Sequence, residues 1–243
     1  MSEISRRTML KVIGALGPST MLPAKAALAA GVSSDTAPPA YRFFNADEAA
    51  FIEAAVSRLI PAEEQWPGAL EAGVPNFIDL QLAGAWGAGE RLYRSGPWQH
   101  GTKTQGYQLP FTPAELFHKA IGAINKESAG APFATMSSDQ QDSFLENLQS
   151  GGKDLGGVPS EVFFEQLWEL TLEGFFSDPV YGGNRDMVAW RMIGFPGAYA
   201  SYYDLVDQHG IKIERPPTSL AEDASRHVHP NPNIPAYLPP LGK

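Results

Sequence analysis

The chain has 243 residues, of which 18 are basic and 27 acidic, so it carries a net charge of −9, and it contains no cysteine. The negative charge argues against binding to nucleic acid, whose phosphates need a basic surface, and against electrostatic docking on anionic lipid. Without cysteine the chain can hold neither an iron–sulfur cluster through thiolates nor a haem attached through CxxCH, and it has no cysteine nucleophile.

The N-terminus has the pattern of a twin-arginine export signal. Arg6 and Arg7 precede a modestly apolar stretch over residues 12–22, and small residues suitable for a signal peptidase follow at 24–29. We therefore predict a signal over residues 1–29 that exports an already folded protein; the alternative is an ordinary basic N-terminus before an apolar helix. The chain has no apolar run long enough to span a membrane, so membrane contact is expected only through a partner.

After a predicted linker over residues 30–42, the chain is expected to form one helical domain over residues 43–213. Asn45 followed by Glu48 predicts a capping box. The helix that it starts has an apolar stripe, which consists of Phe51, Ile52, Ala55, Val56, Leu59 and Ile60. A second helix is predicted from about Pro75, with an inward face of Phe77, Ile78 and Leu82.

The middle of the chain is predicted to alternate a long loop with two more helices. Residues 84–110 are rich in glycine and proline and predict a helix end followed by the loop. Thr112-Pro-Ala-Glu115 predicts a helix start, and the apolar stripe that follows consists of Leu116, Phe117, Ala120, Ile121 and Ile124. Ser137 and Gln140 cap a further helix with the apolar residues Phe144, Leu145 and Leu148.

The most apolar helix is predicted to start at Ser160, after a flexible connection over residues 151–159. Because apolar residues occur all round this helix, we expect it to be central. Short helices are predicted over 188–192 and 198–207, and the proline-rich residues 214–243 form an extended tail. Alternating β-branched runs are scarce, so the fold class is mainly α, as a single helical domain with long loops.

Few residues have the pattern of a catalytic or metal site. His227 and His229 are two potential metal ligands, but the proline-rich segment around them offers no third one, so an exposed loop is favoured. Gly84-x-x-Gly87-x-Gly89 has the reverse order of the dinucleotide fingerprint and is rejected as one. The remaining histidines are isolated: His100, His118 and His209. The acids that lie close together in the sequence are interpreted as solvated charges: Glu63, Glu64, Asp204 and Asp207.

The most unusual stretch is the loop over residues 174–186. Asp-Pro and Gly-Gly-Asn predict tight turns, and three aromatic residues, an arginine and two acids share the loop. One interpretation is a structural turn fixed by its aromatic residues. A second is a recognition surface, because Arg, Tyr and Trp are enriched at interface hot spots. The candidate partner-contacting residues are Asp178, Tyr181, Asn184, Arg185 and Trp190.

The motif Asp178-Pro-Val-Tyr-Gly-Gly-Asn-Arg185, with Trp190 and Gly194-Phe-Pro-Gly197, resembles subunit 3 of membrane-bound gluconate 2-dehydrogenase. The N-terminal pattern of that family is also present, as Leu59-Ile-Pro61, Pro67-Gly-Ala-x-Glu-Ala-Gly-Val74 and Phe77-Ile-Asp79. The resemblance covers about residues 43–207, and the twin-arginine signal also fits this family.

This resemblance implies a small, non-catalytic subunit that itself holds no cofactor and no metal. Its partners would be a large FAD-containing flavoprotein of the glucose–methanol–choline oxidoreductase class and a multihaem cytochrome c subunit. The cytochrome passes electrons to ubiquinone and holds the complex on the periplasmic face of the inner membrane. The small subunit would help the flavoprotein to mature and carry it through the twin-arginine export machinery.

The sequence is also compatible with related assignments. Similar subunits serve 2-ketogluconate, fructose, sorbitol or glucose dehydrogenases, although the chain length and the long tail favour the gluconate or ketogluconate type. Two further hypotheses are a stand-alone periplasmic binding protein and a stand-alone exported enzyme. A stand-alone enzyme would need converging titratable groups, which the sequence does not offer.

Overall fold

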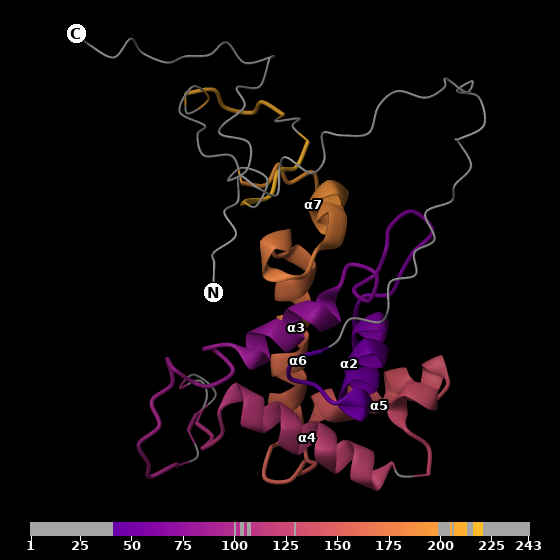
Figure 1. The fold of residues 1–243 in the computed structure, drawn as a ribbon, viewed down its shortest axis with the longest axis vertical. Coiled ribbons are helices and arrows are strands. Elements are labelled where there is room, and N and C mark those ends of the chain that lie inside the picture. The colour runs from indigo at the N-terminus through magenta and orange to yellow at the C-terminus, as the bar shows by residue number, and fades with distance from the viewer. Residues whose placement is uncertain are drawn as a thin grey trace, which may run out of the picture. The chain divides into compact units, whose positions relative to one another are not determined.

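The computed structural model describes residues 41–99, 101–102, 105, 108–128, 130–198, 205, 207–212 and 216–220 (Figure 1). The predicted signal with Arg6 and Arg7, nearly all of the linker and most of the tail lie outside the described residues. Within them the chain forms six α-helices and three short 3₁₀ helices, with no β-strand. The prediction of a mainly α domain is confirmed for this part of the chain. None of the helices in it has the length and apolar character needed to cross a bilayer.

Three of the helices start at the capping boxes that the sequence predicts. They are α2 (Ala46–Leu59), α4 (Pro113–Glu127) and α5 (Ser138–Ser150). In each of them the side chain of the capping residue accepts a hydrogen bond from the backbone N–H of the third helical residue, and that residue's side chain accepts one in return: Asn45 with Glu48, Thr112 with Glu115, and Ser137 with Gln140. These local contacts confirm the predicted helix starts.

The helix α3 (Val74–Ala83) has a proline in its first turn, as predicted. Beyond it, the described residues of the segment 84–110 form turns and no α-helix, in agreement with the predicted long loop. The connection over residues 151–159 differs from its prediction, because it is a packed turn. Leu155 and Val158 are fully buried there, and the Leu155 N–H donates to the Val158 carbonyl at 2.8 Å. These two apolar side chains anchor a segment whose glycines suggested flexibility.

The helix α6 (Ser160–Phe176) lies at the centre of the domain and packs against α2, α3, α4, α5 and α7 (Val188–Ile193) (Figure 1). Its Phe163 ring lies 5.3 Å from the ring of Phe117 in α4 and 6.0 Å from that of Phe51 in α2. The short helix at 188–192 is confirmed as α7, whereas most of the predicted helix at 198–207 lies outside the described residues. The central position expected for α6 is confirmed.

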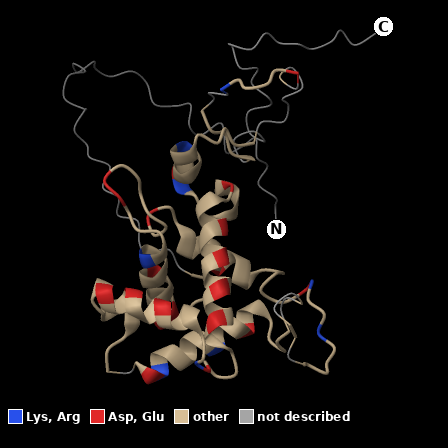
Figure 2. Cartoon of the chain, turned by 180° about the vertical axis from the view of Figure 1, so that it is seen from behind, with Lys and Arg blue, Asp and Glu red and all other residues tan. Residues whose placement is uncertain are grey.

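The burial of α6 is one-sided, although its apolar residues occur all round. The buried side consists of Ser160, Phe163, Leu167, Leu170, Thr171, Gly174 and Phe175. On the opposite side Trp168 is 36% exposed and Phe176 38% exposed. The acidic residues of the helix follow this open side (Figure 2). The five neighbouring helices leave Trp168 and Phe176 exposed among the described residues, whereas Phe164, nearer the start of α6, packs in part against the core.

A single carboxylate fixes the place where the chain enters the domain. Asp79 of α3 is 1% exposed, and its two oxygens accept hydrogen bonds from the backbone N–H groups of Arg42 (2.8 Å), Phe43 (2.9 Å) and Phe44 (3.0 Å). Asn45, the next residue, caps α2. Asp79 therefore clamps the start of α2 onto α3 and joins the segment that follows the linker to the core.

Candidate functional site

The loop between α6 and α7 is built from two 3₁₀ turns, η3 (Pro179–Tyr181) and η4 (Arg185–Met187). Asp178 caps the first turn: its Oδ1 accepts from the Val180 N–H at 2.9 Å, and its Oδ2 accepts from the Leu220 N–H at 2.8 Å. One buried carboxylate thus closes the turn and holds a segment that lies much later in the chain. The loop is tied to the domain at its first residue.

Asn184 is the internal brace of the loop. Its side chain is fully buried; Nδ2 donates to the Ser177 carbonyl at 2.8 Å, and Oδ1 accepts from the Ala189 N–H at 2.9 Å. The φ angle of Asn184 is 43°, in the left-handed region that asparagine tolerates better than most residues. Its amide therefore joins the end of α6 to the first turn of α7.

The two glycines of the motif let the loop approach α3 and α6 closely. The carbonyl of Gly182, whose φ is 95°, accepts a hydrogen bond from Asn76 Nδ2 of α3 at 2.9 Å. A Cβ at Gly183 would lie 2.2 Å from the carbonyl oxygen of Gly174 in α6, closer than any side chain allows. Only glycine fits at 183, so this backbone contact accounts for the Gly-Gly pair.

Trp190 of α7 lies beneath the loop and is buried. Its indole Nε1 donates to the Phe176 carbonyl at 2.8 Å, which satisfies one of the last carbonyls of α6. Its ring makes an edge contact with Phe195 at a centroid distance of 5.1 Å. Trp190 therefore connects α6, α7 and the Phe195-Pro-Gly197 turn.

Tyr181 and Arg185 are the exposed members of the predicted set. Tyr181 is 52% exposed and follows the half-exposed Val180. The backbone N–H of Arg185 donates to the Ala72 carbonyl at 2.8 Å, which fixes the main chain, while the side chain is exposed. None of the ion pairs among the described residues involves Arg185.

The structure thus places four of the five predicted residues in the loop between α6 and α7 and the fifth, Trp190, in α7 next to it, and it divides their roles. Asp178, Asn184 and Trp190 hold the loop together, as the structural interpretation expected. Tyr181 and Arg185 present a phenol and a guanidinium on its surface, as a recognition surface requires. Partner contact by any of the five stays a prediction.

The remaining residues considered from the sequence form no reaction centre in the described part of the chain. His118 on α4 is half-exposed; its Nδ1 lies 2.7 Å from Glu48 Oε1, and Phe43 stacks on its ring at 4.0 Å. Glu63, Glu64, Asp207 and His209 are exposed, and His100, Asp204, His227 and His229 lie outside the described residues. No three acidic or histidine side chains among the described residues are placed to hold a metal ion.

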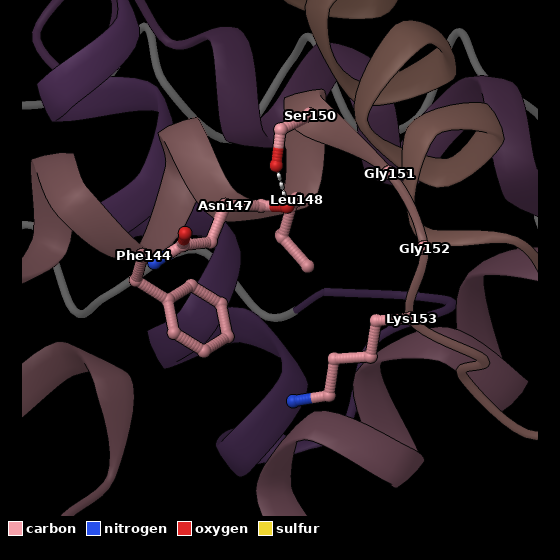
Figure 3. A pocket seen from close by; sticks show the side chains of 7 residues that line it. All are labelled: Phe144, Asn147, Leu148, Ser150, Gly151, Gly152 and Lys153. Atoms are coloured by element: carbon pink, nitrogen blue, oxygen red, sulfur yellow. Dashed lines mark hydrogen bonds between the residues drawn. The ribbon is translucent and has the colours of Figure 1, made fainter.

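A shallow depression of about 390 Å³ lies between the end of α5 and the turn that follows it (Figure 3). Its lining contains one ionisable side chain, Lys153, which forms an ion pair with Glu127 and lies 5.9 Å from the Phe144 ring centroid. A lysine held in this ion pair, in a lining that contains no second titratable side chain, does not form the arrangement that acid–base or nucleophilic chemistry requires.

Two features of the structure were missed by sequence reasoning. The clamp by Asp79 had a signal, namely an acid within the inward stripe of Phe77, Ile78 and Leu82. The open side of α6 also had one, because its glutamates recur at every fourth position from Glu161 to Glu173.

A family model described as gluconate 2-dehydrogenase subunit 3 matches residues 46–197, well over half of the chain. The match includes all six helices and the whole loop between α6 and α7. No curated protein and no solved structure matches the chain.

Proposed function

The chain belongs to the gluconate 2-dehydrogenase subunit 3 family, and we propose that it is the non-catalytic small subunit of a periplasmic flavoprotein dehydrogenase complex. The observation that carries this proposal is the family match over the entire described helical core, including the loop with its buried braces and its two exposed side chains. In the proposed complex the oxidation takes place on an FAD-containing large subunit, and a multihaem cytochrome c subunit takes up the electrons.

We further propose that this subunit supports folding of the large subunit and its export by the twin-arginine machinery. The paired arginines at the N-terminus support an export role, since that route accepts folded proteins. The rigid loop supports a binding role, because a preorganised surface loses little conformational entropy when it binds. Location at the inner membrane then follows from the partner subunits.

The purified chain is expected to bind no flavin and no haem and to reduce no dye with gluconate. The absence of cysteine excludes thioether-linked haem, and the sequence has no dinucleotide fingerprint. Co-purification with the large subunit should give a flavin absorbance band together with gluconate-dependent dye reduction. A stoichiometric flavin band, or turnover, from this chain alone would refute the non-catalytic assignment.

Replacement of Tyr181 or Arg185 by alanine is expected to weaken binding of the large subunit. Both side chains are exposed, and loss of a hot-spot side chain costs about 2 kcal/mol, or roughly 30-fold in Kd. Biolayer interferometry with the immobilised small subunit measures the affinity, and thermal unfolding of each variant measures its stability.

The matched comparison is Asn184→Ala, which removes a buried brace from the same loop. This variant should lower the melting temperature, with unchanged affinity per folded molecule. Unchanged affinity in both Tyr181→Ala and Arg185→Ala would show that the loop is only an element of the fold.

A further inference from the structure

The open side of α6 carries two parallel rows of side chains, each with a four-residue spacing. One row is apolar and consists of Phe164, Trp168, Leu172 and Phe176. The second is acidic and consists of Glu161, Glu165, Glu169 and Glu173. Residues four apart on a helix lie above one another and form a ridge, so the two rows run side by side along α6. Figure 2 shows the acidic residues of the helix in red.

Two members of the apolar row, Trp168 and Phe176, are exposed among the described residues. Phe164 packs in part against the core and Leu172 is partly buried, so the exposed stretch of the row lies toward the end of α6. Exposed apolar side chains in a continuous row, rather than scattered singly, are typical of a surface that another protein covers.

The acidic row is electrostatically unfavourable in the subunit alone. The sequence of α6 contains no lysine or arginine, and none of the ion pairs among the described residues involves one of its glutamates. Like charges four residues apart on a helix repel each other and destabilise it. The pKa of the Glu173 carboxyl is raised, first by partial burial and then by repulsion from Glu169. Cations placed along this row would relieve the repulsion.

We propose that the open side of α6 binds the large flavoprotein subunit through a surface on which lysine or arginine side chains run in a row beside apolar ones. This inference rests on the function proposed above and names the chemistry of the partner's surface. Self-association through the same face is disfavoured, because a two-fold pair would bring two acidic rows together. An anionic lipid surface would be repelled by the same row.

The test measures binding of the large subunit to full-length small-subunit variants in low and high salt. We expect E165K/E169K to weaken binding at least about tenfold, because charge reversal sets cations against cations. E165Q/E169Q, which keeps the shape of the side chains, should weaken binding less and reduce its salt dependence. W168A should weaken binding about tenfold through the apolar row.

The matched control is E63K/E64K, which makes the same change of charge on an exposed loop outside α6 and should leave affinity within about twofold of the wild type. Wild-type affinity in E165K/E169K, E165Q/E169Q and W168A would overturn the inference and leave the proposed function intact. Failure of the wild-type subunit to bind the large subunit at all would instead overturn the proposed function.

The same variants also show whether a different partner covers the open side of α6. Light scattering that shows a dimer of the small subunit, dissolved by E165K/E169K, would assign the face to self-association. Variant effects that vanish when residues 1–29 are deleted would assign it to the chain's own basic N-terminal segment. Either result would overturn the proposed partner.

Discussion

Replacement of both Arg6 and Arg7 by lysine is expected to leave the flavoprotein activity in the cytoplasm. The twin-arginine receptor reads the arginine pair as an address, and lysine keeps the positive charge while removing the guanidinium groups. The net charge of the chain is unchanged, so a lost export reports on recognition rather than on electrostatics. Gluconate-dependent dye reduction in separated periplasmic and cytoplasmic fractions measures the outcome.

This assay mutates one chain and measures an activity that is proposed to reside on another. A variant in the small subunit that retains the large subunit inside the cell shows that the two are exported together. The control is Lys11→Arg and Lys25→Arg, which makes the same type of exchange outside the pair and should leave export unchanged. Normal periplasmic activity of the double-lysine variant would contradict the carrier role.

The features that the sequence predicts well are the ones that depend on neighbouring residues. A capping box needs a polar residue and a glutamate or glutamine three positions later, so the starts of α2, α4 and α5 are encoded locally. The tight turns after α6 follow in the same way from Asp-Pro and Gly-Gly-Asn. Local signals are therefore sufficient to predict a loop of tight turns at the candidate site.

The division of roles within that loop is not encoded locally. Asn184 is buried because its amide reaches backbone groups at the ends of both α6 and α7, and Asp178 is buried partly by the distant Leu220. The sequence pattern does not distinguish the polar side chains of the motif that become buried from those that stay exposed. Only the packing against α3 and α6 separates the braces from the exposed Tyr181 and Arg185.

The same limit applies to α6. Hydrophobic periodicity counts apolar side chains but does not say whether the chain itself or a partner buries them. The sequence therefore predicts a central helix correctly and misses that Trp168 and Phe176 remain exposed. For a subunit of a larger complex, we expect such errors where a helix that is apolar on all sides is covered on one side only.

Replacement of Asp79 by alanine is expected to lower the free energy of unfolding by about 3–5 kcal/mol. The change leaves three backbone N–H groups, at residues 42–44, without their acceptor, and the Phe44 N–H is in a buried position. It also releases the start of α2 from α3. Urea unfolding followed by circular dichroism measures the loss, and replacement of the exposed Asp207 by alanine should change stability by less than about 0.5 kcal/mol.

Asp79→Asn distinguishes the carboxylate clamp from simple loss of packing. Asparagine fills the same space and keeps one oxygen, which can still accept from the N–H groups of Phe43 and Phe44, but it sets an NH₂ group against the Arg42 N–H. We therefore expect a loss smaller than that of alanine but clearly measurable. If Asp79→Asn matched the wild type while Asp79→Ala unfolded, neither the negative charge nor the second oxygen of Asp79 would be needed to hold α2 in place. Residues 42–44 lie where the predicted linker meets the domain. Loss of this clamp would therefore unravel the domain from the end that bears the predicted export signal, and we expect less of the small subunit and its partner to reach the periplasm.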